Sequence, residues 1–390
     1  MDCSKKRASA VGDLPVDPLV EILSRVPAKS VCRFKCVSKA WRDLIADPHH
    51  RKKLPQAMQG LFCHTAKESE AGLSYSFSFI DLVPRSVPLD IDPCFSFLTE
   101  LPEIQTLVLS DSCSGLVLFM HFEKQNSTTL GYVVCNPTTK EWEVVPACGA
   151  PTSEETYPCV AFDPAVPSHF NLVQFLTGDN EEFLSVHVYS SETGAWSENL
   201  IDEQGEEGQF PGWRNVSFPL ARLYPCPFIN GFLHFMVWDQ DETKIVALDA
   251  QGKGRRMIPV PHVAEMGVSI CYFGESQGKL HFMTEKILND DHEYKYKLFI
   301  WVLQDYNAQE WVLKCTVNSH EVFGENSAKE GSMEFEVVGI HQDRNVIFFT
   351  HPSGRHKLVA YDMDREELCT IATFDDQEWL MDTARYVPFF

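Results

Sequence analysis

The stretch NPTTKEW at residues 136–142 recurs in altered form along most of the chain. It is a cluster of turn-forming residues followed by a large apolar side chain. Four later stretches have the same form: SSETGAW, DAQGKGRRM, DYNAQEW and YDMDREEL, which place Trp196, Met257, Trp311 and Leu368 where the first has Trp142. The steps between these five positions are 54, 61, 54 and 57 residues. The sequence therefore predicts a structural unit repeated at this period.

A second pattern runs in phase with the first. Each unit also contains an apolar stretch preceded by glycine or asparagine, such as SGLVLF, NGFLHF, GKLHF and NVIFFT at 114–119, 230–235, 278–282 and 345–350. Other segments are rich in aromatic and β-branched residues, which is typical of strands, at 73–83, 183–189 and 297–303. Hairpins and strands repeated at this period are typical of four-stranded β-propeller blades.

The number of units sets the expected number of blades. Five units lie between about residues 104 and 374, and LFCHT with LSYSFSFIDLV predicts an irregular first one. We therefore expect a mainly β fold with six blades. The final segment ARYVPFF at 384–390 is expected to pair with the first blade, because a ring removes sheet edges only when its ends are joined. AKESEA at 66–71 breaks the strand pattern and predicts an exposed loop.

Residues 14–45 form the one block with a helical period. Asp17 followed by Pro18 predicts a helix start, and Pro27 predicts the end of that helix. Two further helices should follow, with Ser38 as the cap of the third. A unit of this size is usually too small to be stable alone. It either packs only on its own domain or leaves apolar surface for another protein, and the spacing does not decide between these.

The same block resembles the F-box, the adaptor-binding motif of cullin-RING ubiquitin ligases, and in particular its plant branch. The matching words are LP, ILSRVP, KS and RFKCVSKAW, and the resemblance covers residues 12–58. The family often ends with an aromatic residue where this chain has PHHRKK. The resemblance implies that ten residues contact a Skp-type adaptor or hold the helices together: Leu14, Pro15, Ile22, Leu23, Val26, Pro27, Val31, Phe34, Val37 and Trp41.

The remainder of the chain resembles the plant F-box-associated domain. SCSGLVLF, CNPTTKEW, INGFLHFMVW, WVLQDYNAQEW, GIHQDRNVIFF and LVAYDMDREEL are similar to recurring phrases of that domain. The resemblance implies a propeller that recognises a substrate. We thus expect three regions: a disordered N-terminus at 1–11, an F-box at 12–58 and the propeller at 59–390.

Composition limits the possible partners. The formal net charge is −22; residues 1–60 carry +6 and the rest −28. An acidic body argues against nucleic acid as the main ligand. No apolar run approaches the roughly 18 residues of a membrane helix, so no membrane partner is expected. Thirteen cysteines without a C-x-x-C pair, and no apolar signal segment, predict reduced thiols and a location in the cytoplasm or nucleus.

No local motif indicates catalysis or a cofactor. The chain has no G-x-S-x-G elbow, no phosphate-binding loop and no G-x-G-x-x-G turn. His234 and His281 occupy matching places in two repeats, which favours a structural role. Two polar loops are expected at 201–219 and 288–297, and aromatic residues with arginine are typical of binding hot spots. We predict substrate contacts from the first loop, at Phe210, Trp213, Arg214 and Phe218. The alternative is an ordinary connection between blades with these aromatic residues folded inward.

These observations favour a non-catalytic substrate receptor of an SCF-type ubiquitin ligase. Its expected partners are the Skp-type adaptor, through it the cullin and RING subunits, and an unidentified target protein; no cofactor or metal is expected. Two alternatives stay open. One is a propeller enzyme or glycan binder, which would need converging polar groups in the channel or on one rim. The other is a scaffold that binds the adaptor without ligase activity.

Overall fold

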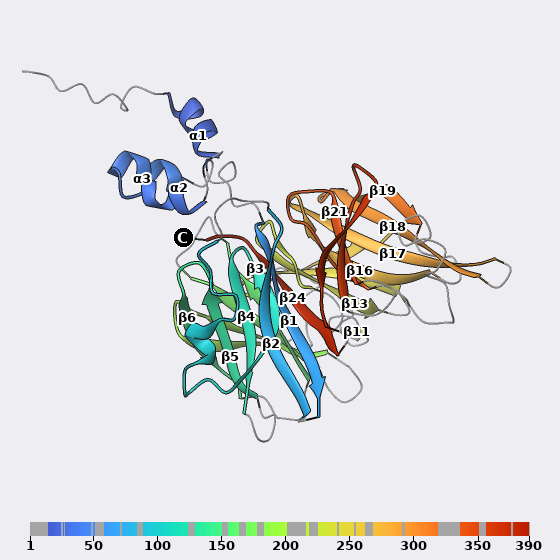
Figure 1. The fold of residues 1–390 in the computed structure, drawn as a ribbon, viewed down its shortest axis with the longest axis horizontal. Helices are drawn as coiled ribbons and strands as arrows, with labels where there is room; N and C mark the ends of the chain where they lie inside the picture. The colour runs from blue at the N-terminus through green and yellow to red at the C-terminus, as the bar shows by residue number, and fades with distance from the viewer. Residues whose placement is uncertain are drawn as a thin grey trace, which may run out of the picture.

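The computed structural model describes most of the chain as six small antiparallel sheets and four short helices (Figure 1). The sheets form a six-bladed β-propeller, as the period predicts. The three N-terminal helices stand apart from the sheets. The described residues are 15–24, 26, 28–47, 50, 58–70, 72–83, 89–123, 129–149, 155–163, 169–177, 183–200, 216–217, 225–239, 242–252, 255–261, 268–290, 293–318, 336–350, 356–375 and 377–389.

The blades follow one another along the chain, each with its strands paired in sequence. Blade 2 contains β3 (Thr106–Cys113), β4 (Leu116–Phe122), β5 (Thr129–Asn136) and β6 (Glu141–Pro146). Blade 3 contains β7 (Glu155–Ala161), β8 (Asn171–Thr177), β9 (Phe183–Ser190) and β10 (Ala195–Leu200). In blade 4, β11 (Val216–Ser217) and β12 (Phe228–Ile229) both pair with β13 (Phe232–Asp239). On its other side β13 pairs with β14 (Glu242–Asp249), which pairs with β15 (Arg255–Pro259).

The last two four-stranded blades repeat this order. Blade 5 contains β16 (Val268–Ser276), β17 (Lys279–Asp290), β18 (Glu293–Asp305) and β19 (Glu310–Asn318). Blade 6 contains β20 (Val337–Ile340), β21 (Val346–Thr350), β22 (Lys357–Asp362) and β23 (Glu367–Thr373). Blade 1 joins the two ends of the propeller, because β24 (Glu378–Tyr386) pairs with β1 (Gly60–Ser69), which pairs with β2 (Gly72–Asp81).

Six hydrophobic clusters hold the ring together, one between each pair of neighbouring blades. Successive residues of a strand point to opposite faces, so one strand serves two interfaces. On β4, Val117 and Phe119 pack toward blade 1, whereas Leu116 and Leu118 pack toward blade 3. The apolar cores of the propeller therefore lie between blades, and each blade depends on both of its neighbours.

The turn between the third and fourth strands has the same construction in several blades. Its first residue is Asn or Asp, and the side chain accepts a hydrogen bond from the backbone N–H two residues later, as at Asn136, Asp305 and Asp362. Its fifth residue adopts a left-handed backbone with φ of 56–62° at Lys140, Gln309 and Glu366, and Gly194 has φ of 65° in the turn of blade 3, which begins with Ser190. This local chemistry is the physical basis of the recurring sequence stretch.

The large apolar residue after the turn packs against the preceding blade in blades 3, 4 and 5, at Trp196, Met257 and Trp311. Trp196 lies opposite Tyr189 in the register, and both belong to the cluster between blades 2 and 3. The indole N–H of Trp196 donates to the backbone oxygen of Pro146, the last residue of β6, at 2.8 Å. Trp311 makes the same bond to Pro259, the last residue of β15, also at 2.8 Å. These anchors join the outer strands of neighbouring blades.

The C-terminal strand closes the ring, as expected from the tail. Gly60 pairs with Tyr386 and Phe62 with Ala384. The pairing begins at Lys67 with Glu378, earlier than the predicted segment, and residues after Tyr386 continue onto blade 2. There Asn136 donates from Nδ2 to the backbone oxygen of Phe389 at 2.9 Å. Closure thus involves both a shared sheet and a contact with the next blade.

Three local expectations are wrong. AKESEA does not form a loop, because β1 continues to Ser69 and Ala66 is fully buried. The segment 288–297 is not a loop either, because β17 and β18 form one long hairpin with only residues 291 and 292 between them. The first helix begins at Val16, so Asp17 lies in its first turn instead of capping it.

Replacing Gly115 should destabilise the closure. Its φ is +101°, and an added Cβ would lie 2.5 Å from Cβ of Phe389 and 2.6 Å from the backbone oxygen of Val387. We expect Gly115→Ala to lower the free energy of unfolding by more than the roughly 1–3 kcal/mol of backbone strain alone. Gly231→Ala is the matched control, because Gly231 has φ of +83° in the corresponding turn of blade 4 and open space around it. Urea unfolding measures both; equal losses would contradict the close contact.

Candidate functional site

The N-terminal helices form a small unit with a core of its own. They are α1 (Val16–Ser24), α2 (Ala28–Phe34) and α3 (Lys39–Ala46). Leu23, Val31 and Ile45 are buried together, and the partly buried side chains around them also come from this unit. The rings of Phe34 and Trp41 meet edge to face with centroids 5.3 Å apart. The described residues of this cluster include none from the propeller.

Two local features set the ends of these helices. Ser38 has an extended backbone, and its hydroxyl accepts a hydrogen bond from the backbone N–H of Trp41 at 3.2 Å, which confirms the predicted cap. The first helix ends at Ser24, shortly before Pro27. The cap at Ser38 and the proline at position 27 thus divide the block into three short helices that can fold back on one another.

The same unit leaves large apolar side chains in solvent. Val16, Ile22 and Val37 are exposed by 49%, 52% and 62%. Ile22 is adjacent in sequence to Leu23, which is 1% exposed. Consecutive helical residues point about 100° apart, so one enters the core and the other faces outward. The helices therefore present an apolar surface that neither their own core nor the described propeller residues cover.

The structure divides the ten predicted adaptor-site residues into three groups. Leu23, Val26, Val31, Phe34 and Trp41 contribute to the core of the helical unit. Pro15, Ile22 and Val37 are exposed. Leu14 and Pro27 lie outside the described residues. Sequence analysis missed Val16, which is also exposed, and its apolar side chain beside Pro15 was the available signal.

The chain leaves the helical unit at the end of the ring where the strands close. The backbone N–H of Met58 donates to Asp343, in the turn between β20 and β21, at 2.8 Å. The backbone N–H of Gln59 donates to the backbone oxygen of Tyr386 at 2.9 Å. Where the chain enters β1, it is therefore held by blade 6 through Asp343 and by β24 through Tyr386.

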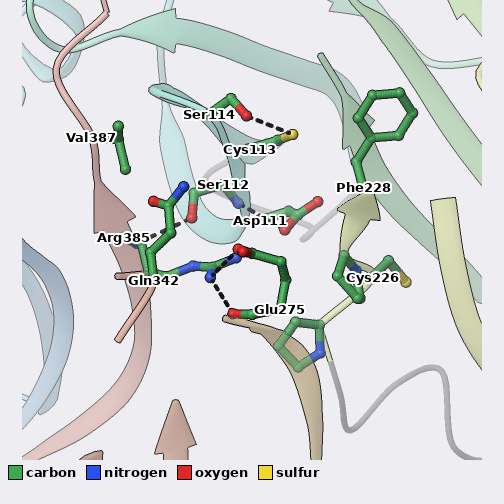
Figure 2. A pocket seen from close by; sticks show the side chains of 12 residues that line it. Asp111, Ser112, Cys113, Ser114, Cys226, Phe228, Glu275, Gln342, Arg385 and Val387 are labelled. Carbon is green, nitrogen blue, oxygen red and sulfur yellow. Dashed lines mark hydrogen bonds and ion pairs between the residues drawn. The ribbon is translucent and has the colours of Figure 1, made fainter. Parts of the chain in front are cut away.

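A small polar cavity of about 30 Å³ lies at this end of the propeller channel (Figure 2). Its walls come from the ends of inner strands in several blades. Arg385 of β24 points toward Glu275 of β16, and its Nη1 donates to both Oε2 and the backbone oxygen of that residue, at 3.1 and 2.9 Å. The backbone N–H of Arg385 donates to the hydroxyl of Ser112 on β3 at 3.1 Å.

Asp111 is the second acidic group of this cavity. Burial raises its pKa to about 6, although hydrogen bonds from the backbone N–H groups of Val160 and Ser112 and the nearby charge of Arg385 act in the opposite direction. Asp111, Arg385 and Glu275 thereby join β3, β7, β16 and β24 across the channel. Their arrangement links blades and closes the ring.

The dimensions of the cavity limit what it can bind. About 30 Å³ admits a water molecule or two, whereas small-molecule sites occupy roughly 300–1,000 Å³. Among the described residues, no group of three or more His, Cys, Asp or Glu side chains is placed to hold a metal ion. The described cysteines are all free thiols. None of the helices in the described part of the chain is long and apolar enough to cross a membrane.

The histidines noted in the repeats are buried in the blades. His234 lies between the backbone oxygen of Pro227, 3.2 Å from Nδ1, and the hydroxyl of Tyr306, 2.7 Å from Nε2. Nδ1 of His281 is 3.1 Å from the backbone oxygen of Lys279. The predicted substrate contacts Phe210, Trp213, Arg214 and Phe218 lie outside the described residues.

Comparison with known families identifies both regions. Residues 96–378 match the F-box associated beta propeller domain family, which is more than half of the chain. The chain belongs to this family. Residues 12–53 match the F-box domain, so the helical unit is the F-box of an F-box associated propeller protein. The family assignment agrees with the resemblance drawn from the turn and helix motifs.

Relatives from Arabidopsis thaliana resemble this F-box protein over most of its length. The F-box protein At5g07610 is 28% identical over 81% of this chain and 72% of its own length. The putative F-box protein At5g42430 is 25% identical over 84% of this chain and 77% of its own. The F-box/kelch-repeat protein At4g19930 is 24% identical over 87% and 76%. Among solved structures, an oligogalacturonate lyase in complex with manganese matches 77% of this chain and 71% of its own with 10% identity and a TM-score of 0.40, which is too remote to support an argument.

Buried histidines should make the stability of the propeller depend on pH. Burial lowers the pKa of His234, His281 and His341 from 6.5 to about 4. The unfolded chain then binds protons at higher pH than the folded one, so the free energy of unfolding should fall as the pH drops from 6.5 toward 4. Each group contributes about 1.4 kcal/mol per pH unit within this window. Urea unfolding at pH 7, 6 and 5 measures the slope.

Asp111 opposes this trend and supplies the control. Its folded pKa of about 6 lies above the ordinary 3.8, so protonation between these values favours the folded state. His121, with a lowered pKa, and Glu285, with a raised pKa, add one group of each kind. The histidines outnumber the carboxyls. Asp111→Asn should therefore steepen the loss of stability below pH 6, and a wild-type profile that is flat from pH 7 to 5 would contradict the assignment.

Proposed function

We propose that this chain is the substrate-receptor subunit of an SCF-type ubiquitin ligase. The F-box docks on a Skp-type adaptor, and the propeller holds a target protein. The observation that carries the proposal is the exposure of Ile22 and Val37 on a helical unit whose own core is complete. Exposed apolar surface next to a packed core is typical of a protein interface.

The proposed activity involves no covalent chemistry by this chain. The cullin and RING subunits bring a ubiquitin-loaded conjugating enzyme to the target, and the receptor raises the local concentration of target lysines near it. The small polar cavity and its use in closing the ring support a non-catalytic role for the propeller. Free buried thiols at Cys63, Cys113 and Cys135 support a location in the cytoplasm or nucleus.

A charge on the exposed F-box surface should abolish adaptor binding. Ile22→Asp places a carboxylate where an apolar contact forms, and we expect at least a roughly 30-fold loss of affinity for a Skp-type adaptor, the scale of an interface hot spot. Val37→Asp should have a similar effect. Pull-down and titration with purified adaptor measure it, and unchanged binding by Ile22→Asp would refute the proposal.

Two further variants separate docking from folding. Leu23→Asp buries a charge in the core of the helical unit, so it should lose adaptor binding together with the helical signal of the F-box. Val312→Asp is the surface control, because Val312 is 44% exposed on β19 of the propeller, and it should bind the adaptor normally. Ubiquitination reconstituted with the cullin and RING subunits then distinguishes a ligase receptor from a scaffold.

The segment 201–219, in which the structure describes only the strand residues Val216 and Ser217, is proposed to contribute to target binding. Trp213 and Phe210 combine large aromatic surfaces with several carboxylates in the same segment. For a target captured by proximity labelling under proteasome inhibition, the double variant Phe210→Ala with Trp213→Ala should bind at least about tenfold more weakly. Co-precipitation of that target compares the variant with the wild type, and full retention would remove these residues from the site.

A further inference from the structure

Among the described residues, blade 1 has no outer strand of the kind that the other five blades have. Its described sheet contains β24, β1 and β2, whereas the others continue to β6, β10, β15, β19 and β23. The chain that follows β2 takes another course, since its described residues 89–105 pack over Phe77 and Phe79. Part of this segment is the short helix α5 (Ser96–Thr99). β2 is therefore the third strand of blade 1, and its outer side is a sheet edge with no described partner strand.

Most of the edge of β2 lacks the usual protection against strand pairing. Residues 72–80, GLSYSFSFI, contain no charged residue and no proline, and all ten residues of β2 pair with β1 without a bulge. The only charged residue of β2 is Asp81 at its C-terminal end, whereas the outer strands of blades 2, 3 and 5 carry charged residues within the strand, such as Glu143, Glu198 and Lys314. Charges, prolines and bulges are the features that prevent edge-to-edge pairing. The N–H and C=O groups of β2 can therefore accept another strand.

Trp142 provides an independent second observation. It lies opposite Cys135 in the register, and Cys135 belongs to the cluster between blades 1 and 2, so the indole faces blade 1. Trp196 and Trp311 occupy the same place in blades 3 and 5, where each donates to the last carbonyl of the preceding outer strand. Trp142 is 40% exposed, and its indole N–H has no hydrogen-bond partner among the described residues.

From these observations we infer that β2 and Trp142 form a docking site for an extended segment of the target protein. The segment adds to blade 1 as a fourth strand, antiparallel to β2, and its final carbonyl accepts a hydrogen bond from the indole N–H of Trp142. Its backbone supplies the pairing and its alternate side chains contact the exposed Leu73 and Tyr75. The inference rests on the proposed function, because it specifies how the receptor holds its target.

Charge selects the kind of segment that fits. Carboxylates lie at both ends of β2, at Asp81 and, on β1 opposite Leu73, at Glu68, and the whole chain carries −22. A second copy of the chain would bring the same negative charge to the edge. The favoured occupant is therefore a target segment with lysine or arginine alternating with apolar residues.

Selection of peptides on the full-length chain tests this site. The probe is a display library of random 12-residue peptides, from which binders are recovered, sequenced and synthesised. We expect peptides with basic and apolar residues in alternation, and binding should slow amide hydrogen exchange at residues 72–81. Recovery of no binder, or protection of another blade, would overturn the inference, and acidic binders at β2 would overturn its charge selectivity.

Variants identify the contacts of the selected peptide. Trp142→Ala, and the double variant Leu73→Lys with Tyr75→Lys, should each weaken binding at least about tenfold. Trp238→Ala is the matched control, because Trp238 is 42% exposed on β13 of blade 4. This variant should bind the selected peptide as tightly as the wild type does. Equal affinities for all variants would also overturn the inference.

Adaptor titration on the same protein preparations keeps the two proposals separate. Normal adaptor binding with no selected peptide at β2 rejects this docking site alone. Peptide binding at β2 in a chain that does not bind the adaptor rejects the ligase function and leaves β2 as a peptide site.

Discussion

The pairing of β24 with β1 is the constraint on which the rest of the propeller depends. Each blade buries both faces against its neighbours, so the six interfaces are complete only when the last strand returns to the first. The pairing joins Gly60 to Tyr386 across most of the chain and has to offset the entropy of closing that loop. Arg385 adds a contact with Glu275 across the channel, and Phe389 extends the closure to blade 2. The C-terminal residues thus belong to the core of the fold.

A second set of contacts holds the outside of the ring. In blades 3, 4 and 5 the residue after the turn packs against the preceding blade, and at Trp196 and Trp311 the indole N–H also binds the end of the outer strand of that blade. Inner strands are thus joined through the channel, and outer strands through the turns. Blade 1 receives the inner contact through β24 but has no described outer strand for Trp142. Blade 1 therefore has its inner strand, β24, but no described outer strand.

Sequence patterns predicted those parts of the fold that local chemistry determines. Turn residues such as Asn136 and Asp305 act within a few positions, and the two-residue period of strands is local as well. The sequence predicted the three described strands of blade 1, at LFCHT, LSYSFSFIDLV and the tail. It did not predict that β2 has no described outer neighbour, because the alternation in residues 73–83 suits a third or a fourth strand equally. The arrangement of Asp111, Glu275 and Arg385 had no sequence signal, since these residues are more than one hundred positions apart. Ile22 and Leu23 both lie in the apolar stripe, and only the packing of three helices separates 52% exposure from 1%.

The position of the closure also determines where recognition can occur. The chain enters the ring beside Tyr386, and the polar cavity lies at the same end, where Arg385 and Glu275 use its hydrogen-bonding groups to join blades. The cavity at this end has room for no more than a water molecule or two. The chain enters the propeller there, where the backbone N–H of Met58 donates to Asp343. The outer edge of β2, in contrast, belongs to the rim, so the adaptor and the target that we propose as partners would bind without sharing residues.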